Sequence, residues 1–322
     1  MKKVLIIGAA GQIGSELTLT LRQQLSGEQV VAADLKSIAD RKLAESGPFY
    51  QINCLNKERL QEIVANEKPD AIYQLAAILS AVAEDNPQRA WTVNMTCLQN
   101  VLEVARETGA QVFFPSSIAA FGPSTPLDDT PQVTIQRPTT IYGITKVAGE
   151  LLCDYYFDRF GVDTRGLRFP GLISYRTPPG GGTTDFAVDI YYKAVLGEKY
   201  VCYLKPETRL PMMYMPDAVR AMIEVMEADP TKLKHRNAFN IHAVSASPED
   251  FARSIRKFIP DFTIRFDVDP VRQKIAESWP RSLNDSAARE EWNWQPQYDL
   301  DSLTQDMITN LSQKLGVVNR VQ

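Results

Sequence analysis

The sequence has very few of the residues on which metal-dependent and histidine-dependent enzymes rely. It contains two histidines, His235 and His242, and four cysteines that form no Cys-x-x-Cys pair. A Ser-His-Asp or Cys-His site would need one of these two histidines, and a zinc ribbon or thioredoxin-type redox site is excluded. We therefore expect no metal site. The cysteines are scattered and expected to be free, which favours a reducing, cytoplasmic compartment.

Excess positive charge and long apolar runs are also missing. The 322 residues include 35 Lys and Arg against 39 Asp and Glu, a formal net charge of −4, so we do not expect nucleic acid as a partner. No apolar run approaches the ~18 residues of a membrane-spanning helix, so we expect no membrane partner. With 44% hydrophobic and 23% charged residues, the composition is that of a globular protein.

The first half of the chain alternates short apolar strands with amphipathic helices. We expect strands at residues 4–7, 30–33, 71–75, 111–115 and 164–169, and helices at residues 13–24, 57–66, 87–107 and 141–159. This alternation predicts an α/β fold with a doubly wound parallel sheet of the Rossmann type and helices on both faces.

The second half is less regular, and a proline- and glycine-rich segment at residues 178–182 predicts a flexible break. After it we expect strands at residues 212–215, 238–241 and 263–268, and helices at residues 185–196, 216–228, 248–258, 286–292 and 300–314. We therefore predict a dinucleotide-binding domain over residues 1–172, to which residues 212–242 return. Residues 173–211 and 243–322 are expected to form a smaller C-terminal α/β substrate-binding part.

The first expected strand runs directly into the segment Gly8-Ala9-Ala10-Gly11-Gln12-Ile13-Gly14. Glycines at this spacing allow a tight turn, a close approach of the backbone to a pyrophosphate, and close packing of the next helix on the strand. The helix N-terminus, at Gln12 and Ile13, also offers amide donors to phosphate. We interpret the segment as a dinucleotide-binding turn; a glycine turn without a ligand is the alternative.

Asp34 ends the second expected strand, near the ~20-residue offset at which an acidic residue binds a ribose 2′-hydroxyl. A carboxylate here accepts hydrogen bonds from the ribose and repels a 2′-phosphate, so we expect NAD rather than NADP. Lys36 and Arg41 lie nearby and would soften this preference. An ordinary acidic residue at the end of a strand is the alternative.

A tyrosine–lysine pair supplies the candidate acid–base chemistry. Tyr142 and Lys146 lie four residues apart in an expected helix and share one face of it. An ammonium beside a phenol favours the phenolate and lowers the phenol pKa, so the tyrosine can exchange a proton near neutral pH. Ser117 follows the strand at 111–115, at the sheet edge where ligands bind, and can hold a substrate oxygen beside Tyr142. A turn or helix-capping role is the alternative for Ser117 and the role we expect for Ser116.

Together these motifs resemble the extended short-chain dehydrogenase/reductase superfamily, which includes UDP-galactose epimerase. The motifs are Gly8-x-x-Gly11-x-x-Gly14, Asp34, Ser117 and Tyr142-x-x-x-Lys146. Further stretches, across nearly the whole chain, resemble the short-chain type of L-threonine 3-dehydrogenases. They include Pro179-Gly180-Gly181-Gly182-Thr183-Thr184-Asp185, Arg209-Leu210-Pro211-Met212-Met213-Tyr214 and Trp279-Pro280.

This resemblance implies oxidation of L-threonine by NAD to L-2-amino-3-oxobutanoate. Tyr142 would be the general base, Lys146 would lower its pKa and bond the nicotinamide ribose, and Ser117 would position the hydroxyl. The resemblance also implies cofactor contacts at Asn53, Leu75, Ala76, Ala77, Asn94, Phe169 and Leu172. It implies substrate contacts at Ser80, Gly182, Thr183, Thr184 and Trp279. It also implies a homodimer paired through the helix that carries Tyr142, where Leu151, Leu152 and Tyr155 serve either that interface or the monomer's own core.

Two residues depart from the patterns of relatives. Asn53 stands where many relatives have an adenine-binding aspartate, and an amide can still contact adenine. Phe121 stands where sugar-nucleotide relatives usually have tyrosine, which fits the threonine branch better. Thr183 and Thr184 can alternatively cap the following helix, and Trp279 can alternatively belong to the core.

Two other functions stay open at this point. The first is a nucleotide-sugar epimerase or dehydratase, for which Arg209, Arg220, Arg272 and Arg281 can supply the charge that a diphosphate needs. The second is a non-catalytic dinucleotide sensor, which the intact set of Ser117, Tyr142 and Lys146 disfavours.

Overall fold

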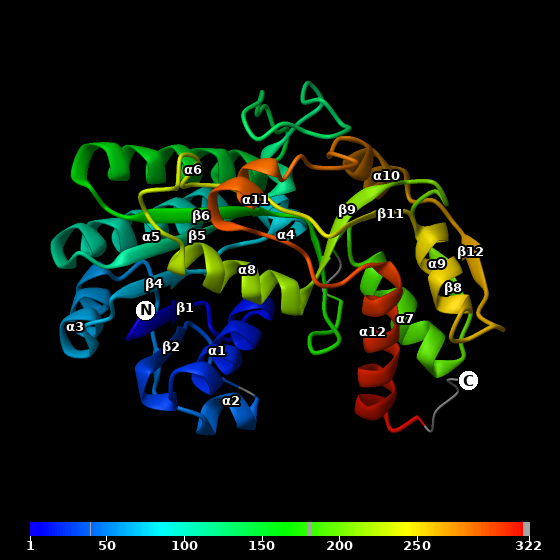
Figure 1. Cartoon of the computed structure of the whole chain (residues 1–322), viewed down its shortest axis with the longest axis horizontal. Coiled ribbons are helices and arrows are strands. Elements are labelled where there is room, and N and C mark those ends of the chain that lie inside the picture. Colours follow the sequence, from blue (N-terminus) through cyan, green and yellow to red (C-terminus); the bar gives the residue numbers. More distant parts are fainter. Residues whose placement is uncertain (39, 180–181, 318–322) are drawn as a thin grey trace.

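The structure is a computed structural model that describes residues 1–38, 40–179 and 182–317 (Figure 1). A seven-stranded sheet with the order β10-β6-β5-β4-β1-β2-β3 forms its larger part, and every strand pair in it is parallel. The strands are β1 (Val4–Ile7), β2 (Val30–Asp34), β3 (Phe49–Gln51), β4 (Ala71–Gln74), β5 (Gln111–Ser117), β6 (Thr164–Phe169) and β10 (Phe239–Asn240). The strand order reverses between β1 and β4, where open α/β sheets bind their ligands. The predicted fold class is confirmed.

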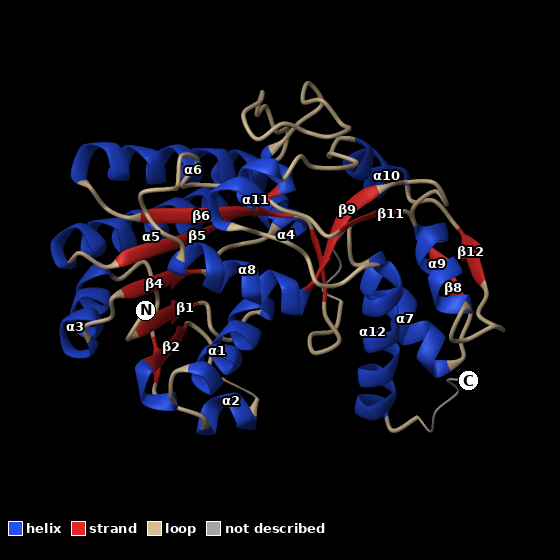
Figure 2. Ribbon diagram, in the orientation of Figure 1, coloured by secondary structure: helices blue, strands red, loops and turns tan. Residues whose placement is uncertain are grey.

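Helices cover both faces of this sheet (Figure 2). On one face lie α1 (Gln12–Gln24), α8 (Met215–Glu227) and α11 (Ser286–Trp292), and on the other lie α3 (Lys57–Glu67), α5 (Pro87–Thr108) and α6 (Ile141–Phe160). In β1, Val4 and Ile6 belong to the first core, and Leu5 and Ile7 belong to the second. Because both faces are buried, the central strand is apolar without alternation.

The smaller part of the molecule is drawn to the right of the sheet in Figure 1. It holds a three-stranded sheet of β7 (Gly171–Ile173), β9 (Leu210–Tyr214) and β11 (Val244–Ala246), and the parallel pair β8 (Tyr200–Cys202) and β12 (Ile264–Phe266). Its helices are α7 (Phe186–Leu196), α9 (Pro248–Arg256), α10 (Pro270–Glu277) and α12 (Leu300–Leu315). They surround a third core built around residues such as Phe186 and Phe251.

Sequence patterns missed mainly the shortest elements. These are α2 (Arg41–Glu45), α4 (Ser80–Asp85), α10, β3, β7, β8, β11, and the 3₁₀ turns η1 (Gly27–Gln29) and η2 (Ile118–Ala120). Elements this short give too few repeats for a periodicity to show. The strand expected at 212–215 is β9, which pairs with β7 and β11, whereas β10 joins the main sheet beside β6.

The expectation of four free cysteines is wrong for one pair. Cys54 and Cys97 form a disulfide, with 5.2 Å between their Cα atoms, while Cys153 and Cys202 are free and buried. The loop between β3 and α3 runs beside α5, where the Asn100 amide holds the Cys54 carbonyl at 2.9 Å. A separation of 43 residues gave no sequence signal for this contact. The inference of a reducing compartment from free cysteines therefore loses part of its basis.

Candidate active site

The glycine turn after β1 is shaped by backbone contacts that leave no room for side chains. Gly8 has φ +92°, and a Cβ there would lie 2.7 Å from the Ala76 nitrogen. A Cβ on Gly14 would lie 2.1 Å from the Gly8 carbonyl oxygen, so only glycine lets α1 begin this close to the turn. Gly11 is the N-cap residue, and no side chain among the described residues caps α1. The first amides of α1, at Gln12 and Ile13, therefore stay available to an anion.

Asp34, at the end of β2, is bonded to this turn. Its Oδ2 accepts the Ala10 amide at 2.9 Å and its Oδ1 accepts the Lys36 amide at 3.0 Å. A carboxylate therefore lies beside the turn, as a ribose-binding acid requires. Asn53 is exposed after β3, and its Oδ1 accepts the Leu55 amide at 3.1 Å, so its amide nitrogen is the group that remains for a ligand.

The segment after β4 lies against the same turn. The Leu75 amide donates to the Ile7 carbonyl at 2.8 Å, and the Gly8 turn packs on Leu75 and Ala76. Ala77 follows them and is only partly buried. Together with the uncapped helix, these contacts form a backbone cradle that fits the pyrophosphate of a dinucleotide.

Asn94 on α5 joins this segment to α6. Its side chain accepts the Ile78 amide at 2.7 Å and donates to the Ile78 carbonyl and to the Thr145 hydroxyl, both at 3.1 Å. Asn94 therefore acts as a brace between two elements of the candidate cofactor groove. Ser80 opens α4 shortly after this segment and is partly buried.

Ser117, Tyr142 and Lys146 are brought together by β5 and α6. Ser117 shares a side-chain hydrogen bond with Tyr142. The Lys146 ammonium lies 5.3 Å from the centroid of the Tyr142 ring and 4.8 Å from that of Phe114. It donates to the Pro115 carbonyl at 2.6 Å. The expected constellation is therefore present as a contiguous group.

Burial has the largest effect on the pKa values of Tyr142 and Lys146. It raises the pKa of Tyr142 to about 12, opposed by the Ser117 hydrogen bond, and lowers the pKa of Lys146 to about 8. The Tyr142 pKa thus differs from the depressed value that the sequence predicts. The main reason is burial, which disfavours the charged phenolate more than the Ser117 hydrogen bond favours it.

The candidate substrate loop lies between β7 and α7. A Cβ on Gly171 of β7 would lie 3.0 Å from the Thr184 Cβ, so Thr184 packs directly on that strand. The Tyr203 hydroxyl donates to the carbonyls of Gly182 at 3.0 Å and Thr183 at 3.3 Å. Sequence reasoning missed Tyr203, because no local motif marks it. The other two glycines of the predicted stretch, Gly180 and Gly181, lie outside the described residues.

The remaining predicted residues are placed by strands and by the smaller core. Phe169 ends β6 and is buried, while Leu172 on β7 is partly exposed. Trp279 follows α10, is only 8% exposed and belongs to the smaller part's core. Its packing matches the core alternative, and its contact with substrate stays a prediction.

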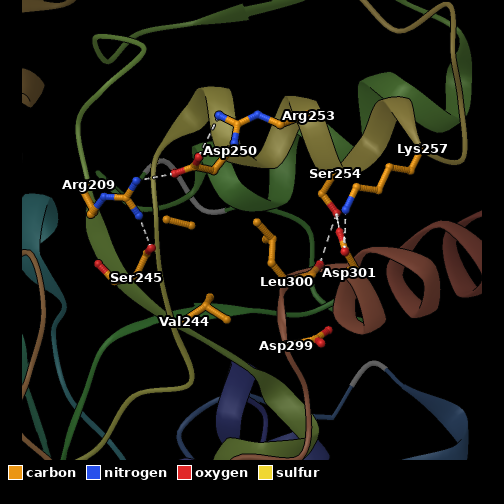
Figure 3. A pocket seen from close by; sticks show the side chains of 11 residues that line it. Arg209, Val244, Ser245, Asp250, Arg253, Ser254, Lys257, Asp299, Leu300 and Asp301 are labelled. Carbon is orange, nitrogen blue, oxygen red and sulfur yellow. Dashed lines mark hydrogen bonds and ion pairs between the residues drawn. The ribbon is translucent and has the colours of Figure 1, made fainter.

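One hollow of the molecule lies away from these residues. It has a volume of about 480 Å³ and is lined by α9, β11 and the start of α12, without any predicted site residue (Figure 3). Its charges pair with one another: Arg209 with Asp250 at 2.8 Å, and Lys257 with Asp301 at 2.5 Å. Within the described residues, no cluster of His, Cys, Asp and Glu could hold a metal, and no helix is long and apolar enough to cross a membrane.

A glycine cradle and a Ser–Tyr–Lys group at the carboxyl edge of a doubly wound sheet define a dinucleotide-dependent enzyme of the short-chain dehydrogenase/reductase class. Residues 4–241 match the NAD dependent epimerase/dehydratase family. The chain belongs to this family, and its cofactor is NAD, as the sequence predicts.

Individual relatives cover almost the whole chain. An uncharacterized epimerase/dehydratase of Staphylococcus saprophyticus is 52% identical over 314 residues, which is 98% of both chains. The structure of L-threonine dehydrogenase from Clostridium difficile is 55% identical with a TM-score of 0.96, covering 98% of both chains. The holo form of a GalE-like L-threonine dehydrogenase from Cupriavidus necator is 50% identical with a TM-score of 0.93, covering 96% of this chain and 99% of that one.

Proposed function

We propose that the protein oxidises L-threonine to L-2-amino-3-oxobutanoate. The observation that carries this proposal is the contiguous group of Ser117, Tyr142 and Lys146 beside the glycine cradle. Solved structures at 50–55% identity that are named L-threonine dehydrogenases support the choice of substrate. NAD, when bound in the cradle, supplies the acceptor for the hydride that leaves the carbon bearing the threonine hydroxyl.

The chain's own residues then handle the proton. Ser117 donates a hydrogen bond that holds the substrate oxygen, and Tyr142 removes the hydroxyl proton. Lys146 stabilises the phenolate electrostatically and bonds the nicotinamide ribose. Because burial raises the Tyr142 pKa, the phenolate forms on the alkaline side. We therefore expect the oxidation rate to rise as the pH increases above neutral.

Substrate selection is assigned to the loop of Gly182, Thr183 and Thr184, with Ser80 and Trp279 as further contacts. The packing of Thr184 on Gly171 brings the loop to the strand that follows Phe169, the predicted neighbour of the nicotinamide. Hydroxyl groups can bond the carboxylate or the ammonium of an amino acid. A small zwitterion needs less room than a nucleotide sugar, which suits a compact loop.

The nucleotide-sugar alternative has lost support. The arginines that would bind a diphosphate are engaged within the chain: Arg209 with Asp250, Arg220 with Asp217 and Glu224, and Arg281 with Asp128. Arg272 lies 4.3 Å over the Tyr203 ring. Recruiting them would require these pairs to break.

Absorbance of NADH tests the proposal directly. Purified protein with NAD and L-threonine should form NADH. An epimerase or dehydratase regenerates its NAD within each turnover and releases no NADH, so conversion of UDP-glucose is followed by chromatography of the sugar nucleotide, and none is expected. Turnover of UDP-glucose without threonine oxidation would contradict the proposal, and turnover of neither would favour a dinucleotide sensor. We also propose that the protein is a cytoplasmic homodimer paired through α6.

A further inference from the structure

A buried ionic cluster lies one helical turn beyond the lysine of the candidate site. Glu150 follows Lys146 by four residues on α6, so the two side chains lie on the same face. The Glu150 carboxylate is 4% exposed and is held by Arg168 of β6 through two bonds, at 3.0 Å and 2.8 Å. It also accepts the Gln136 amide at 2.8 Å and the Ser116 hydroxyl.

This cluster contacts both sides of the candidate site. Ser116 immediately precedes Ser117 at the end of β5, while Glu150 shares α6 with Tyr142 and Lys146. Arg168 is anchored separately, by the Gln132 carbonyl at 2.8 Å and the Asn240 side chain at 3.1 Å. A buried ion pair contributes little net stability compared with apolar packing, so stability alone does not explain why Glu150 and Arg168 are paired here.

We propose that Glu150 is a positioning residue that fixes the Ser116–Ser117 end of β5 against α6 and places a negative charge one turn from Lys146, with Arg168 balancing that charge. The inference rests on the proposed function. Glu150 opposes the effect of burial on the Lys146 ammonium, whose pKa would otherwise fall further. Without this carboxylate, a larger fraction of the lysine would be neutral at any given pH.

Several other titratable groups on α6 and on the elements packed against it have partners of their own or are neutral. They are Glu84 of α4, Glu103 of α5, Arg165 of β6, and Cys153 and Asp154 of α6 itself. Glu84 accepts the Ile141 amide, Glu103 accepts the Tyr156 hydroxyl, Arg165 pairs with Asp163, and Asp154 accepts the Asn237 amide. Burial raises the pKa of the Cys153 thiol well above its usual value, so this group is neutral.

The charges that remain in Glu150→Gln determine the direction in which the pKa values of the site move. Glu150→Gln keeps an oxygen that can accept from Ser116 and Arg168, but it leaves the Arg168 charge uncompensated. The potential at the site becomes more positive, which lowers the pKa of both Tyr142 and Lys146. The two act as a coupled pair, so both limbs of the pH profile of kcat/KM should move to lower pH.

The experiment measures kcat/KM for threonine against pH at saturating NAD. In Glu150→Gln we expect both limbs to move down by about one pH unit, the scale of a nearby charge. Adding Arg168→Gln removes the unpaired cation, so the double variant should bring the limbs back toward their original position. Glu103→Gln, which removes a carboxylate from the neighbouring helix, should leave both limbs in place.

Limbs that stay in place in an active Glu150→Gln variant would overturn the inference, because a structural role changes the rate without moving them. If this variant does not fold, Arg168→Lys is measured instead. It keeps the positive charge beside Glu150 but loses the two forked bonds, so the limbs should stay in place. A shift of either limb by a pH unit or more would also overturn the inference. Absence of threonine oxidation in the unmodified protein would instead overturn the proposed function.

Discussion

At the scale of single residues, Tyr142 is the group on which the proposed chemistry depends. Tyr142→Phe removes the hydroxyl but keeps the ring beside Lys146, so turnover with threonine should fall by about 10²–10⁴-fold. Binding of NAD, measured by calorimetry, should change little. Tyr50→Phe is a suitable control because its hydroxyl bonds Glu67 on α3, outside the predicted site. A Tyr142→Phe enzyme with a near-normal rate would remove Tyr142 from the role of general base.

Asp34 is the residue expected to favour NAD over NADP. Asp34→Ala removes a carboxylate beside the glycine turn and with it the repulsion of a 2′-phosphate. The ratio of kcat/KM for NAD over NADP should fall by roughly 10–100-fold, the range of one charge-assisted hydrogen bond. Asp34→Asn retains an oxygen that can bond the Ala10 amide and so separates charge from local structure. An unchanged ratio in both variants would contradict the ribose assignment.

Residues in contiguous motifs could be read from the sequence, and residues in long-range contacts could not. Gly8, Gly14 and the Tyr142–Lys146 pair lie within one turn or one helix face, so their spacing alone predicted that they lie close together. The bonds from Glu150 to Arg168 and from Tyr203 to Gly182 join different elements. Nothing in the local sequence distinguishes these side chains from ordinary surface or core residues.

At the scale of elements, the disulfide joins the loop before α3 to α5. The link closes a loop of 43 residues, and closing a loop of this size is worth about 2–4 kcal/mol of unfolding free energy. Protein purified without reductant should therefore show two reactive thiols in denaturant, and four after reduction. Reduction should lower the urea midpoint of unfolding.

Cys202→Ala provides the matched control for this measurement. It removes one of the free, buried thiols, so it should leave one reactive thiol without reductant and the same response to reduction. Four reactive thiols in the unreduced, denatured protein would show that Cys54 and Cys97 are not linked.

At the scale of the whole molecule, strand–helix alternation predicted the main sheet because each unit buries an apolar strand beneath an amphipathic helix. Most helices of the smaller part were expected, but its three-stranded sheet was not, because that sheet combines β7, β9 and β11 from separated stretches of the chain. Strands of three to five residues paired in this way carry little periodic signal. The third core also combines residues that precede β10 in the chain, such as Phe186, with residues that follow it, such as Phe251.

The outer face of α6 supports the proposed homodimer. Leu151 is 62% exposed and Tyr155 is 53% exposed, and Ile144 two turns earlier is also exposed. Leu152, the other candidate contact, instead packs against the protein's own core. Exposed apolar residues repeated along one helix are typical of a surface covered by a partner. A second copy of the chain, related by a two-fold axis, would pair the same face with itself.

Light scattering after size exclusion tests this pairing. The unmodified protein should have twice the chain mass of 36.1 kDa, and Tyr155→Glu should shift it toward the monomer because two buried carboxylates would meet across the axis. Val133→Glu, at an exposed apolar residue of the loop before α6, should leave the mass unchanged. A mass of one chain for the unmodified protein at micromolar concentration would contradict the proposal. Because Tyr142 and Lys146 begin the same helix, loss of pairing should also lower turnover by loosening α6 against β5.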